Sequence, residues 1–333
     1  MPSCISFFLH LTKSLSVQYY TCIRNLIQRC LMYDIIMIGG GPAGLTAATY
    51  ACRAGKNVLV IEKAGFGGQI TWSPRVENFP GTVSVSGAEL GDKLLEQAMA
   101  QGAEVELEEI TSAAKTDAGT FALTAASGVT YESKAVIIAT GAKPRMMGLE
   151  REEALTGSGV CFCAVCDGAF YAGRPVAVYG GGNSALQDAL LLAEKCSKVF
   201  LIHRRSSFRG EAKLVEALQA KSNVEFILGA TVTALEGENE LTGITLSQNG
   251  ETRRLAVEGL FVAIGHKPDT EAFREVLQLD EAGYAAAGED CCTGTPGLFV
   301  AGDCRTKKVR QVTTAAADGA VAALAACSYL DSL

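Results

Sequence analysis

Short, nearly continuous apolar runs alternate with stretches of helical periodicity along most of the chain. The run YDIIMI (33–38) leads through a glycine-rich turn into a helical pattern and then into the run VLVIE (58–62). The same order recurs at 174–205, where RPVAVYG, a glycine turn, a helical pattern and KVFLIH follow one another. Continuous apolar runs are typical of strands buried on both faces of a parallel sheet. The pattern therefore predicts an α/β chain with two strand–turn–helix–strand units.

A glycine-rich turn joins the first strand to the first helix of each unit. In the first unit, Gly39, Gly41 and Gly44 form a G-x-G-x-x-G pattern directly after the apolar run. The first glycine permits a tight turn, the second lets a pyrophosphate approach the backbone, and the third lets helix and strand pack closely. Glu62 ends the next strand, where its carboxylate can accept a hydrogen bond from a ribose hydroxyl. This order of elements predicts a dinucleotide site.

The second unit repeats the turn but changes the residue at the end of its second strand. Its three small residues are Gly180, Gly182 and Ala185. His203 stands at the position that corresponds to Glu62, and Arg204 and Arg205 follow it. A carboxylate there would repel a 2′-phosphate, whereas arginines bind one through charge-assisted hydrogen bonds. The second site is therefore expected to take NADP, and the first a dinucleotide with a free ribose.

Each unit continues with a stretch of period-two patterning, at 121–135 and at 242–256, that is typical of antiparallel strands. An apolar run and a Gly-x-Lys-Pro segment then follow, at 136–144 and at 260–268. A last apolar run, GLFVAGD (297–303), has no counterpart in the second unit, so we assign it to the first. The sequence thus predicts two Rossmann-like dinucleotide-binding domains of the three-layer ββα type, the second inserted in the first. The expected boundaries are 32–142 with 268–331 for the first domain and 145–266 for the second.

Charge and composition narrow the class of protein. The 333 residues suffice for two domains with their own cores. A net charge of −7 argues against nucleic acid as a partner, because phosphate neutralisation needs a basic surface. The apolar runs stay well below eighteen residues, so no membrane-spanning helix is expected. A secreted disulfide framework is improbable in a chain this large, and we expect the protein in the cytoplasm.

Residues 1–31 differ from the rest of the chain because they contain no acid and no glycine. We expect this leader to be either disordered or untranslated, with the true start at Met32, or to be a targeting segment.

A cluster of cysteines at 161–166 contains the pair Cys163 and Cys166 in a C-x-x-C arrangement. A zinc site would need further ligands, and the remaining histidines and cysteines are poorly spaced for one, so no metal is expected. A structural disulfide across so small a ring would stabilise little. A dithiol that exchanges two electrons with a partner disulfide fits best. Asp167 could protonate the departing thiolate, or could simply be a turn residue ahead of Gly168.

From Met32 to its end, the chain resembles the low-molecular-weight, bacterial-type thioredoxin reductases. The segments that carry the resemblance are GGGPAGLTAA, GGQI, ENFPG, IATGA, CAVCDG, GGGNSA, HRR, FVAIGH and AGDCRTKKVRQ. The resemblance implies a homodimer with FAD at the first site and NADPH at the second. It also implies that electrons pass from NADPH through FAD and a Cys163–Cys166 disulfide to oxidised thioredoxin, in cell redox homeostasis.

The resemblance assigns roles to individual positions. Cys166 matches the thiol that lies against the flavin, Cys163 the thiol that attacks thioredoxin, and Asp167 the proton donor. The positions that match flavin-binding segments are Gly39, Gly41, Gly44, Glu62, Gly68, Gln69, Asn78, Gly302, Asp303, Arg310 and Gln311. The positions that match NADPH contacts are Gly180, Gly182, Asn183, Ser184, His203, Arg204, Arg205 and Arg209. Two features depart from the family pattern: the leader, and Cys161, an additional thiol to which the resemblance gives no role.

Overall fold

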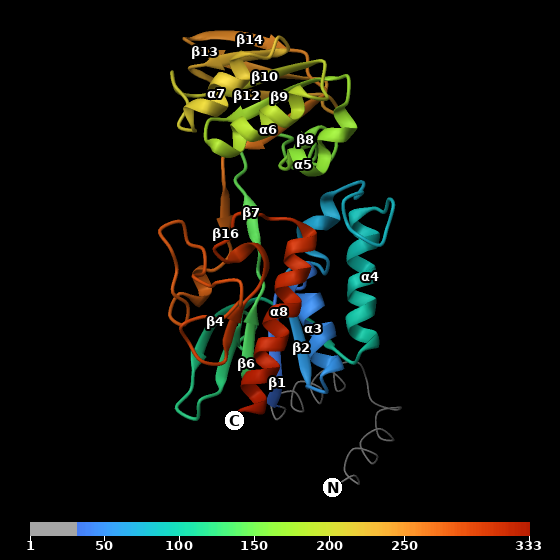
Figure 1. Ribbon diagram of the computed structural model, residues 1–333, viewed down its shortest axis with the longest axis vertical. Coiled ribbons are helices and arrows are strands. Elements are labelled where there is room, and N and C mark those ends of the chain that lie inside the picture. Colours follow the sequence, from blue (N-terminus) through green and yellow to red (C-terminus); the bar gives the residue numbers. More distant parts are fainter. Residues whose placement is uncertain (1–31) are drawn as a thin grey trace. The chain divides into compact units, whose positions relative to one another are not determined.

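The computed structural model describes residues 32–333, and the predicted leader at 1–31 lies outside the described residues. The chain divides into two compact units (Figure 1). The first consists of the described residues up to Gly68, Lys93–Gly141 and Pro268–Leu333. The second consists of Gln69–Asp92 and Ala142–Lys267.

A seven-stranded sheet forms the centre of the first unit. Its strands run in the order β3-β2-β1-β6-β5-β4, and β17 pairs with β6. The parallel strands are β1 (Met32–Ile38), β2 (Val58–Glu62), β3 (Glu104–Leu107), β6 (Thr130–Ile138) and β17 (Leu298–Val300). The antiparallel strands are β4 (Ile110–Lys115) and β5 (Phe121–Ala125). The pairing of β17 with β6 confirms that the last apolar run belongs to the first sheet.

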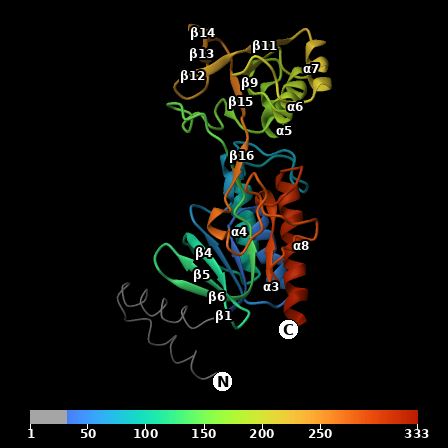
Figure 2. The ribbon, with the colours of Figure 1, turned by 90° about the vertical axis from the view of Figure 1, so that its left-hand side faces the viewer.

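The first sheet is covered on both faces. The helices are α3 (Pro42–Arg53), α4 (Gly87–Ala100) and α8 (Val312–Asp331), with short 3-10 turns η1 (Gly68–Trp72), η3 (Glu271–Phe273) and η4 (Gly302–Cys304). Ile35 and Met37 of β1 pack in one core with α3 and α8, whereas Ile36 and Ile38 pack with β4 and β5 in another. Figure 2 shows the antiparallel strands and the two helices on opposite sides. This is the predicted three-layer ββα arrangement.

The second unit repeats this plan with a five-stranded parallel sheet in the order β11-β10-β9-β15-β8. The strands are β8 (Val160–Cys161), β9 (Pro175–Gly180), β10 (Lys198–His203), β11 (Val224–Leu228) and β15 (Gly259–Ala263). One face carries α5 (Ala164–Asp167), η2 (Gly168–Tyr171), α6 (Asn183–Ala193) and α7 (Ala212–Gln219). The other carries the antiparallel strands β12 (Ala230–Glu236), β13 (Gly243–Gln248) and β14 (Glu251–Leu255).

The two Gly-x-Lys-Pro segments pair with each other. β7 (Ala142–Pro144) and β16 (His266–Pro268) form a two-stranded sheet. Gly141 and Gly265, which precede these strands, have φ of 72° and 110°. This is the left-handed region that glycine adopts without strain, so both chain passages turn sharply before they pair.

The segment 69–92 differs from the prediction, which placed it in the first domain. The structure groups it with the second unit. Val76 pairs with Val85 across a turn, and the guanidinium of Arg75 lies 4.3 Å from the ring centroid of Phe170. A Cβ on Gly157 would lie only 2.8 Å from the carbonyl oxygen of Trp72. These contacts join residues that are distant in sequence, so local patterning could not reveal them.

By length and composition, α8 is apolar enough to cross a membrane, although the short apolar runs of the sequence predicted no membrane-spanning helix. The core helix of a globular protein has the same composition. α8 packs along α3, and its buried Asp318 forms ion pairs with Arg305 and Lys307 of the same unit. We therefore interpret α8 as a helix packed on the first unit and not as a membrane span.

Candidate active site and nucleotide-binding turns

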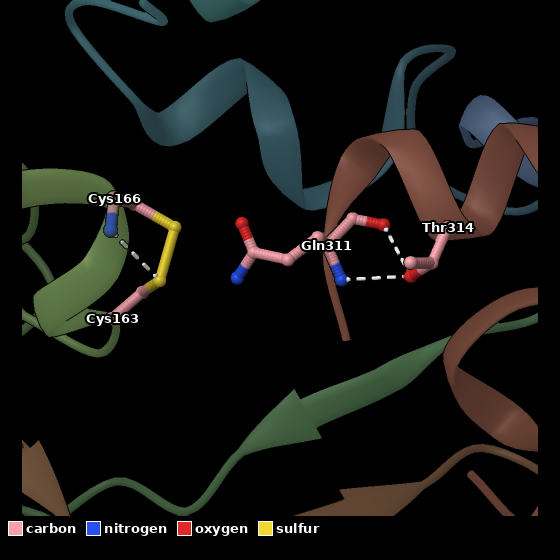
Figure 3. The surroundings of a disulfide bond; sticks show 4 residues. All are labelled: Cys163, Cys166, Gln311 and Thr314. Atoms are coloured by element: carbon pink, nitrogen blue, oxygen red, sulfur yellow. Dashed lines mark hydrogen bonds between the residues drawn. A yellow bond between two sulfur atoms is a disulfide. The ribbon is translucent and has the colours of Figure 1, made fainter. Parts of the chain in front are cut away.

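A disulfide joins Cys163 and Cys166, and their Cα atoms lie 5.3 Å apart (Figure 3). Cys163 is the N-cap of α5, with the extended backbone that this position requires. Its Sγ accepts a hydrogen bond from the backbone N–H of Cys166 at 3.2 Å. Residues three apart on a helical turn lie on one face, so the C-x-x-C spacing brings the two sulfurs together.

Asp167 ends α5, next to the disulfide in sequence. Burial raises the pKa of its carboxyl to about 6, although a hydrogen bond with Cys161 acts in the opposite direction. The Cys161 thiol is buried, its Sγ lies 3.4 Å from the Tyr171 hydroxyl, and burial together with the charge of Asp167 raises its pKa to about 12. A carboxyl with a pKa near 6 can exchange a proton near neutral pH.

The first glycine turn has the geometry that its sequence predicts. A Cβ on Gly39 would lie 2.4 Å from the carbonyl oxygen of Ala139, and one on Gly44 would lie 1.9 Å from that of Gly39. A Cβ on Gly41 would meet only the Cα of Gly68, at 3.9 Å, among the described residues. The turn is therefore closed against its own strand and helix, while Gly41 leaves room at the start of α3 for a ligand.

The second glycine turn has the same form. A Cβ on Gly180 would lie 2.4 Å from the carbonyl oxygen of Ala263, and one on Gly181 would lie 2.2 Å from the ring of His203. A Cβ on Gly182 would meet no atom of residues 32–333 within 4 Å. The N-terminus of α6 thus also faces open space directly after a closed turn.

Comparison with known proteins identifies the family. The family described as "Pyridine nucleotide-disulphide oxidoreductase" matches residues 33–319. A thioredoxin reductase of Treponema pallidum is 40% identical over 304 residues, which cover 90% of this chain and 98% of that protein. One from Listeria monocytogenes is 40% identical over 305 residues, 91% of this chain and 95% of that protein. The chain belongs to the low-molecular-weight thioredoxin reductases.

Solved structures agree with this membership. The thioredoxin reductase of Streptococcus pyogenes superposes with a TM-score of 0.86 at 35% identity, over 91% of this chain and 99% of that chain. The thioredoxin reductase of Giardia duodenalis superposes with a TM-score of 0.84 at 34% identity, over 90% of this chain and 99% of that chain. The predicted fold class is thereby confirmed. Thioredoxin reductases belong to a family whose members typically bind FAD and NAD(P)H.

The first unit of this thioredoxin reductase has a polar atom suited to a flavin nucleotide. Oδ1 of Asp303, on η4, is buried and has no hydrogen-bond partner among residues 32–333. Burial raises the pKa of its carboxyl, against the opposing charges of Lys307 and Arg310. A Cβ on Gly302 would lie 2.9 Å from the Cβ of Ala43, so η4 packs against the start of α3. A buried acceptor beside the first glycine turn fits the hydroxyls of a dinucleotide.

Glu62 lies where the sequence predicts, at the end of β2. Its Oε2 accepts a hydrogen bond from the N–H of Gly40 at 2.7 Å, and its Oε1 accepts one from Ala64 at 2.9 Å. Each carboxylate oxygen has a second lone pair, so Glu62 can still accept from a ribose hydroxyl while it holds the glycine turn in place.

In the second unit, His203 packs beneath the glycine turn. Its ring is stacked on Phe208 with the centroids 5.7 Å apart, and its buried Nε2 has no hydrogen-bond partner within the described part of the chain. Burial lowers the pKa of the imidazole, as do Arg209, Arg205 and Arg204. The ring is therefore neutral at pH 7, and the positive charge of this site comes from the three exposed arginines that follow β10.

The structure brings most of the predicted residues together within each unit. In the first unit, Gly68 lies against Gly41, Arg310 Nε donates to the Asp303 carbonyl oxygen, and Gln311 caps α8 with Thr314 (Figure 3). Gln69 and Asn78, which were predicted to hold flavin, fall in the second unit. Gln69 Nε2 there donates to the carbonyl oxygen of Ala142 at 2.7 Å.

In the second unit, Asn183 and Ser184 begin α6, and both are exposed. Asn183 is already engaged with Glu211 through both its amide nitrogen and its amide oxygen. It therefore anchors the loop that carries Arg209. The backbone N–H of Arg209 donates to the carbonyl oxygen of Gly181 at 2.7 Å.

Sequence reasoning missed two groups of residues. Tyr171 contacts Cys161 beside the redox helix, and Arg305, Lys307 and Asp318 form a buried ion cluster next to η4. A signal for the cluster was present: an acid within the apolar sequence of α8 and two cations just after the last strand.

Proposed function

We propose that this chain is an NADPH-dependent thioredoxin-disulfide reductase, with FAD in the first unit and NADPH and the redox pair in the second. The observation that carries the proposal is the Cys163–Cys166 disulfide at the start of α5, in the same unit as a glycine turn followed by three arginines. With NADPH, the purified protein should reduce oxidised thioredoxin. Purified protein that stays colourless when offered FAD would contradict the proposal.

Cys163 is the thiol that attacks thioredoxin. In the reduced pair, the N–H of Cys166 that points at Cys163 Sγ stabilises a thiolate there. That thiolate attacks one sulfur of the thioredoxin disulfide, and the departing sulfur takes a proton from Asp167. Cys166 then gives its proton to the Asp167 carboxylate and attacks the Cys163 sulfur of the mixed disulfide. The second thioredoxin sulfur departs and takes a proton from water, which releases reduced thioredoxin and restores the Cys163–Cys166 disulfide.

Asp167 suits the role of proton donor because of its raised pKa of about 6. At pH 7 roughly a tenth of such carboxyls carry a proton, against about a thousandth for an unperturbed aspartate. FAD, when bound, supplies the two-electron chemistry that connects NADPH to the disulfide. The protein's part is to orient the two nucleotides through the glycine turns, Glu62, Asp303 and the arginines after β10.

Replacing Arg204 and Arg205 together with alanine is expected to raise the KM for NADPH about a hundredfold and to change that for NADH little. The two guanidinium groups bind only the 2′-phosphate, which NADH lacks. Steady-state kinetics with both nucleotides measures the change. Arg253→Ala is the matched control, because Arg253 pairs with Glu225 on β11 of the same unit. An equal rise of both KM values would contradict the assignment.

We further propose that the chain forms a homodimer in the cytoplasm, where thiols are kept reduced. α3 and α8 expose the large apolar side chains of Tyr50, Val321 and Leu324. A second copy would cover this face. Leu324→Glu is expected to convert the dimer to a monomer in sedimentation experiments, whereas Val83→Glu, at an exposed site in the second unit, is not. Wild-type protein that sediments as a monomer would contradict the dimer.

A further inference from the structure

The redox mechanism leaves Cys161 without a role, yet this thiol lies in direct contact with the proton donor. Cys161 ends β8, Asp167 ends α5 and Tyr171 ends η2, so three successive elements bring their last side chains to one place. Cys161 is 4% exposed, its Sγ lies 3.4 Å from the Tyr171 hydroxyl, and it shares a hydrogen bond with the Asp167 carboxyl.

The protonation of these groups fixes the direction of the two hydrogen bonds. Burial raises the pKa of the Tyr171 hydroxyl and that of the Cys161 thiol, so both keep their protons at neutral pH. An ionised carboxylate only accepts, so the S–H donates to Asp167, and the sulfur in turn accepts from the Tyr171 hydroxyl. The positive charge of Arg174 lowers the pKa of the Tyr171 hydroxyl, but burial outweighs this effect. The sulfurs of Cys163 and Cys166 do not titrate, because they form a disulfide.

The second unit's sheet holds this chain of donors in place. β8 pairs with β15 so that Cys161 lies opposite Phe261. The ring of Phe261 packs edge-on against that of Tyr171, with the centroids 5.4 Å apart. A Cβ on Gly259 would lie 2.8 Å from the Tyr171 ring, so the glycine gives this ring the space it occupies. Tyr171 thus has little freedom to turn away from Cys161.

We propose that Cys161 is a positioning residue that, held by Tyr171, directs the carboxyl of Asp167 toward the redox pair. The inference rests on the proposed role of Asp167 as proton donor. Without the S–H donor, the carboxyl would lose its only hydrogen bond to a side chain in this cluster and would turn away from the departing thiolate. The protein would then reduce thioredoxin more slowly and with a different pH dependence.

The test compares Cys161→Ala with Cys161→Ser. A donor stabilises the carboxylate, so its loss in Cys161→Ala should raise the pKa of Asp167 by about one unit. At the plateau of the pH profile, the rate of thioredoxin reduction should fall about tenfold, while KM for thioredoxin stays unchanged. The pH above which the rate declines should also become higher. Serine supplies an O–H donor, so Cys161→Ser should restore both the rate and the profile.

Infrared titration gives a readout that needs neither NADPH nor thioredoxin. The carboxyl band that disappears in Asp167→Asn belongs to Asp167. The midpoint of its pH titration should rise in Cys161→Ala. It should rise by less in Tyr171→Phe, a variant that keeps the ring against Phe261. Cys196→Ala is the matched control, a second buried cysteine in the same core. An Asp167 band that titrates alike in wild type and Cys161→Ala overturns the inference. Full activity of Asp167→Asn overturns the proposed role of Asp167 itself.

Discussion

Cys163→Ser and Cys166→Ser should each lower NADPH-dependent thioredoxin reduction at least about a thousandfold, while both proteins stay yellow and bind NADPH. Thiol–disulfide exchange needs both sulfurs, one to attack and one to resolve the mixed disulfide, and a serine hydroxyl does neither. The nucleotide turns lie on other elements, at the starts of α3 and α6, so the substitutions leave them intact.

The two variants should also differ from each other. Cys166→Ser keeps the thiol proposed to attack, so it should form a lasting mixed disulfide with thioredoxin whose single cysteine carries a thionitrobenzoate group. Cys163→Ser should form it far more slowly. Mass spectrometry detects the adduct, and Cys292→Ser, which removes an exposed cysteine of the first unit, serves as the control. Rapid adduct formation by Cys163→Ser alone would reverse the assignment of the two thiols.

The parts of the fold that the sequence predicted are those set by local physical rules. Gly39 and Gly180 each precede a helix, because the backbone must turn tightly between a buried strand and that helix, and both the residue type and its spacing report this. The buried strands were visible as apolar runs. The Cys163–Cys166 pair was visible because two thiols on one helical turn have few other uses in a chain of this composition.

The parts that the sequence did not reveal depend on contacts between distant segments. Nothing local indicates that β7 pairs with β16, or that Arg75 lies over Phe170 and joins the segment 69–92 to the second unit. Likewise, Cys161 was recognisable as an additional thiol, but its neighbour Tyr171 is ten residues away and reaches it only because Phe261 of β15 fixes the ring. Such contacts follow from the packed sheet and not from any period in the sequence.

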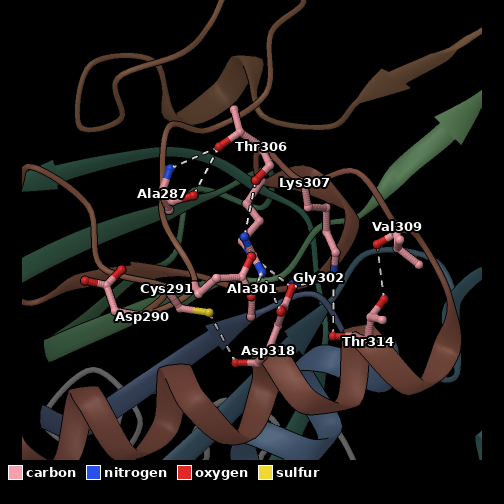
Figure 4. A network of polar contacts seen from close by, with 12 residues as sticks. Ala287, Asp290, Cys291, Ala301, Gly302, Thr306, Lys307, Val309, Thr314 and Asp318 are labelled. Atoms are coloured by element: carbon pink, nitrogen blue, oxygen red, sulfur yellow. Dashed lines mark hydrogen bonds and ion pairs between the residues drawn. The ribbon is translucent and has the colours of Figure 1, made fainter.

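Asp318→Ala should strongly destabilise the first unit while it leaves the glycine turns untouched. The Asp318 carboxylate accepts hydrogen bonds from Arg305 at 2.8 and 2.9 Å. It also accepts hydrogen bonds from Lys307 Nζ at 2.8 Å and from the N–H of Gly302 at 3.0 Å (Figure 4). The side chains of Arg305, Lys307 and Asp318 are 2%, 5% and 8% exposed. Removing the carboxylate leaves the buried Lys307 without its anionic partner and leaves Arg305 only the exposed Glu289 carboxylate, 3.5 Å away. This costs about 3–5 kcal/mol of the free energy of unfolding.

The same substitution should weaken flavin binding, because Asp318 holds the N–H of Gly302 and thereby the turn that presents Asp303. We expect the Kd of the apoprotein for FAD to rise at least about tenfold, as measured by flavin fluorescence. Asp318→Asn keeps an oxygen that accepts a hydrogen bond from Gly302 but loses the charge that pairs with Arg305 and Lys307. It should therefore retain more of the affinity for FAD than of the free energy of unfolding. Asp331→Ala is the matched control, an exposed carboxylate on the same helix that pairs with Lys56, and it should change neither quantity.

The pH dependence of this stabilisation has a definite sign. Burial alone would raise the pKa of Asp318, but hydrogen bonds from Arg305 and Lys307 lower it below its ordinary value. A group whose pKa is lower in the folded than in the unfolded state stabilises the fold above the unfolded pKa, near about 4, and ceases to do so as the pH falls through the folded pKa. The difference in unfolding free energy between wild type and Asp318→Ala should therefore be full at pH 6–7 and should shrink below about pH 4. A difference that stays constant down to pH 2.5 would show that lost packing, and not the charge of the carboxylate, accounts for the effect.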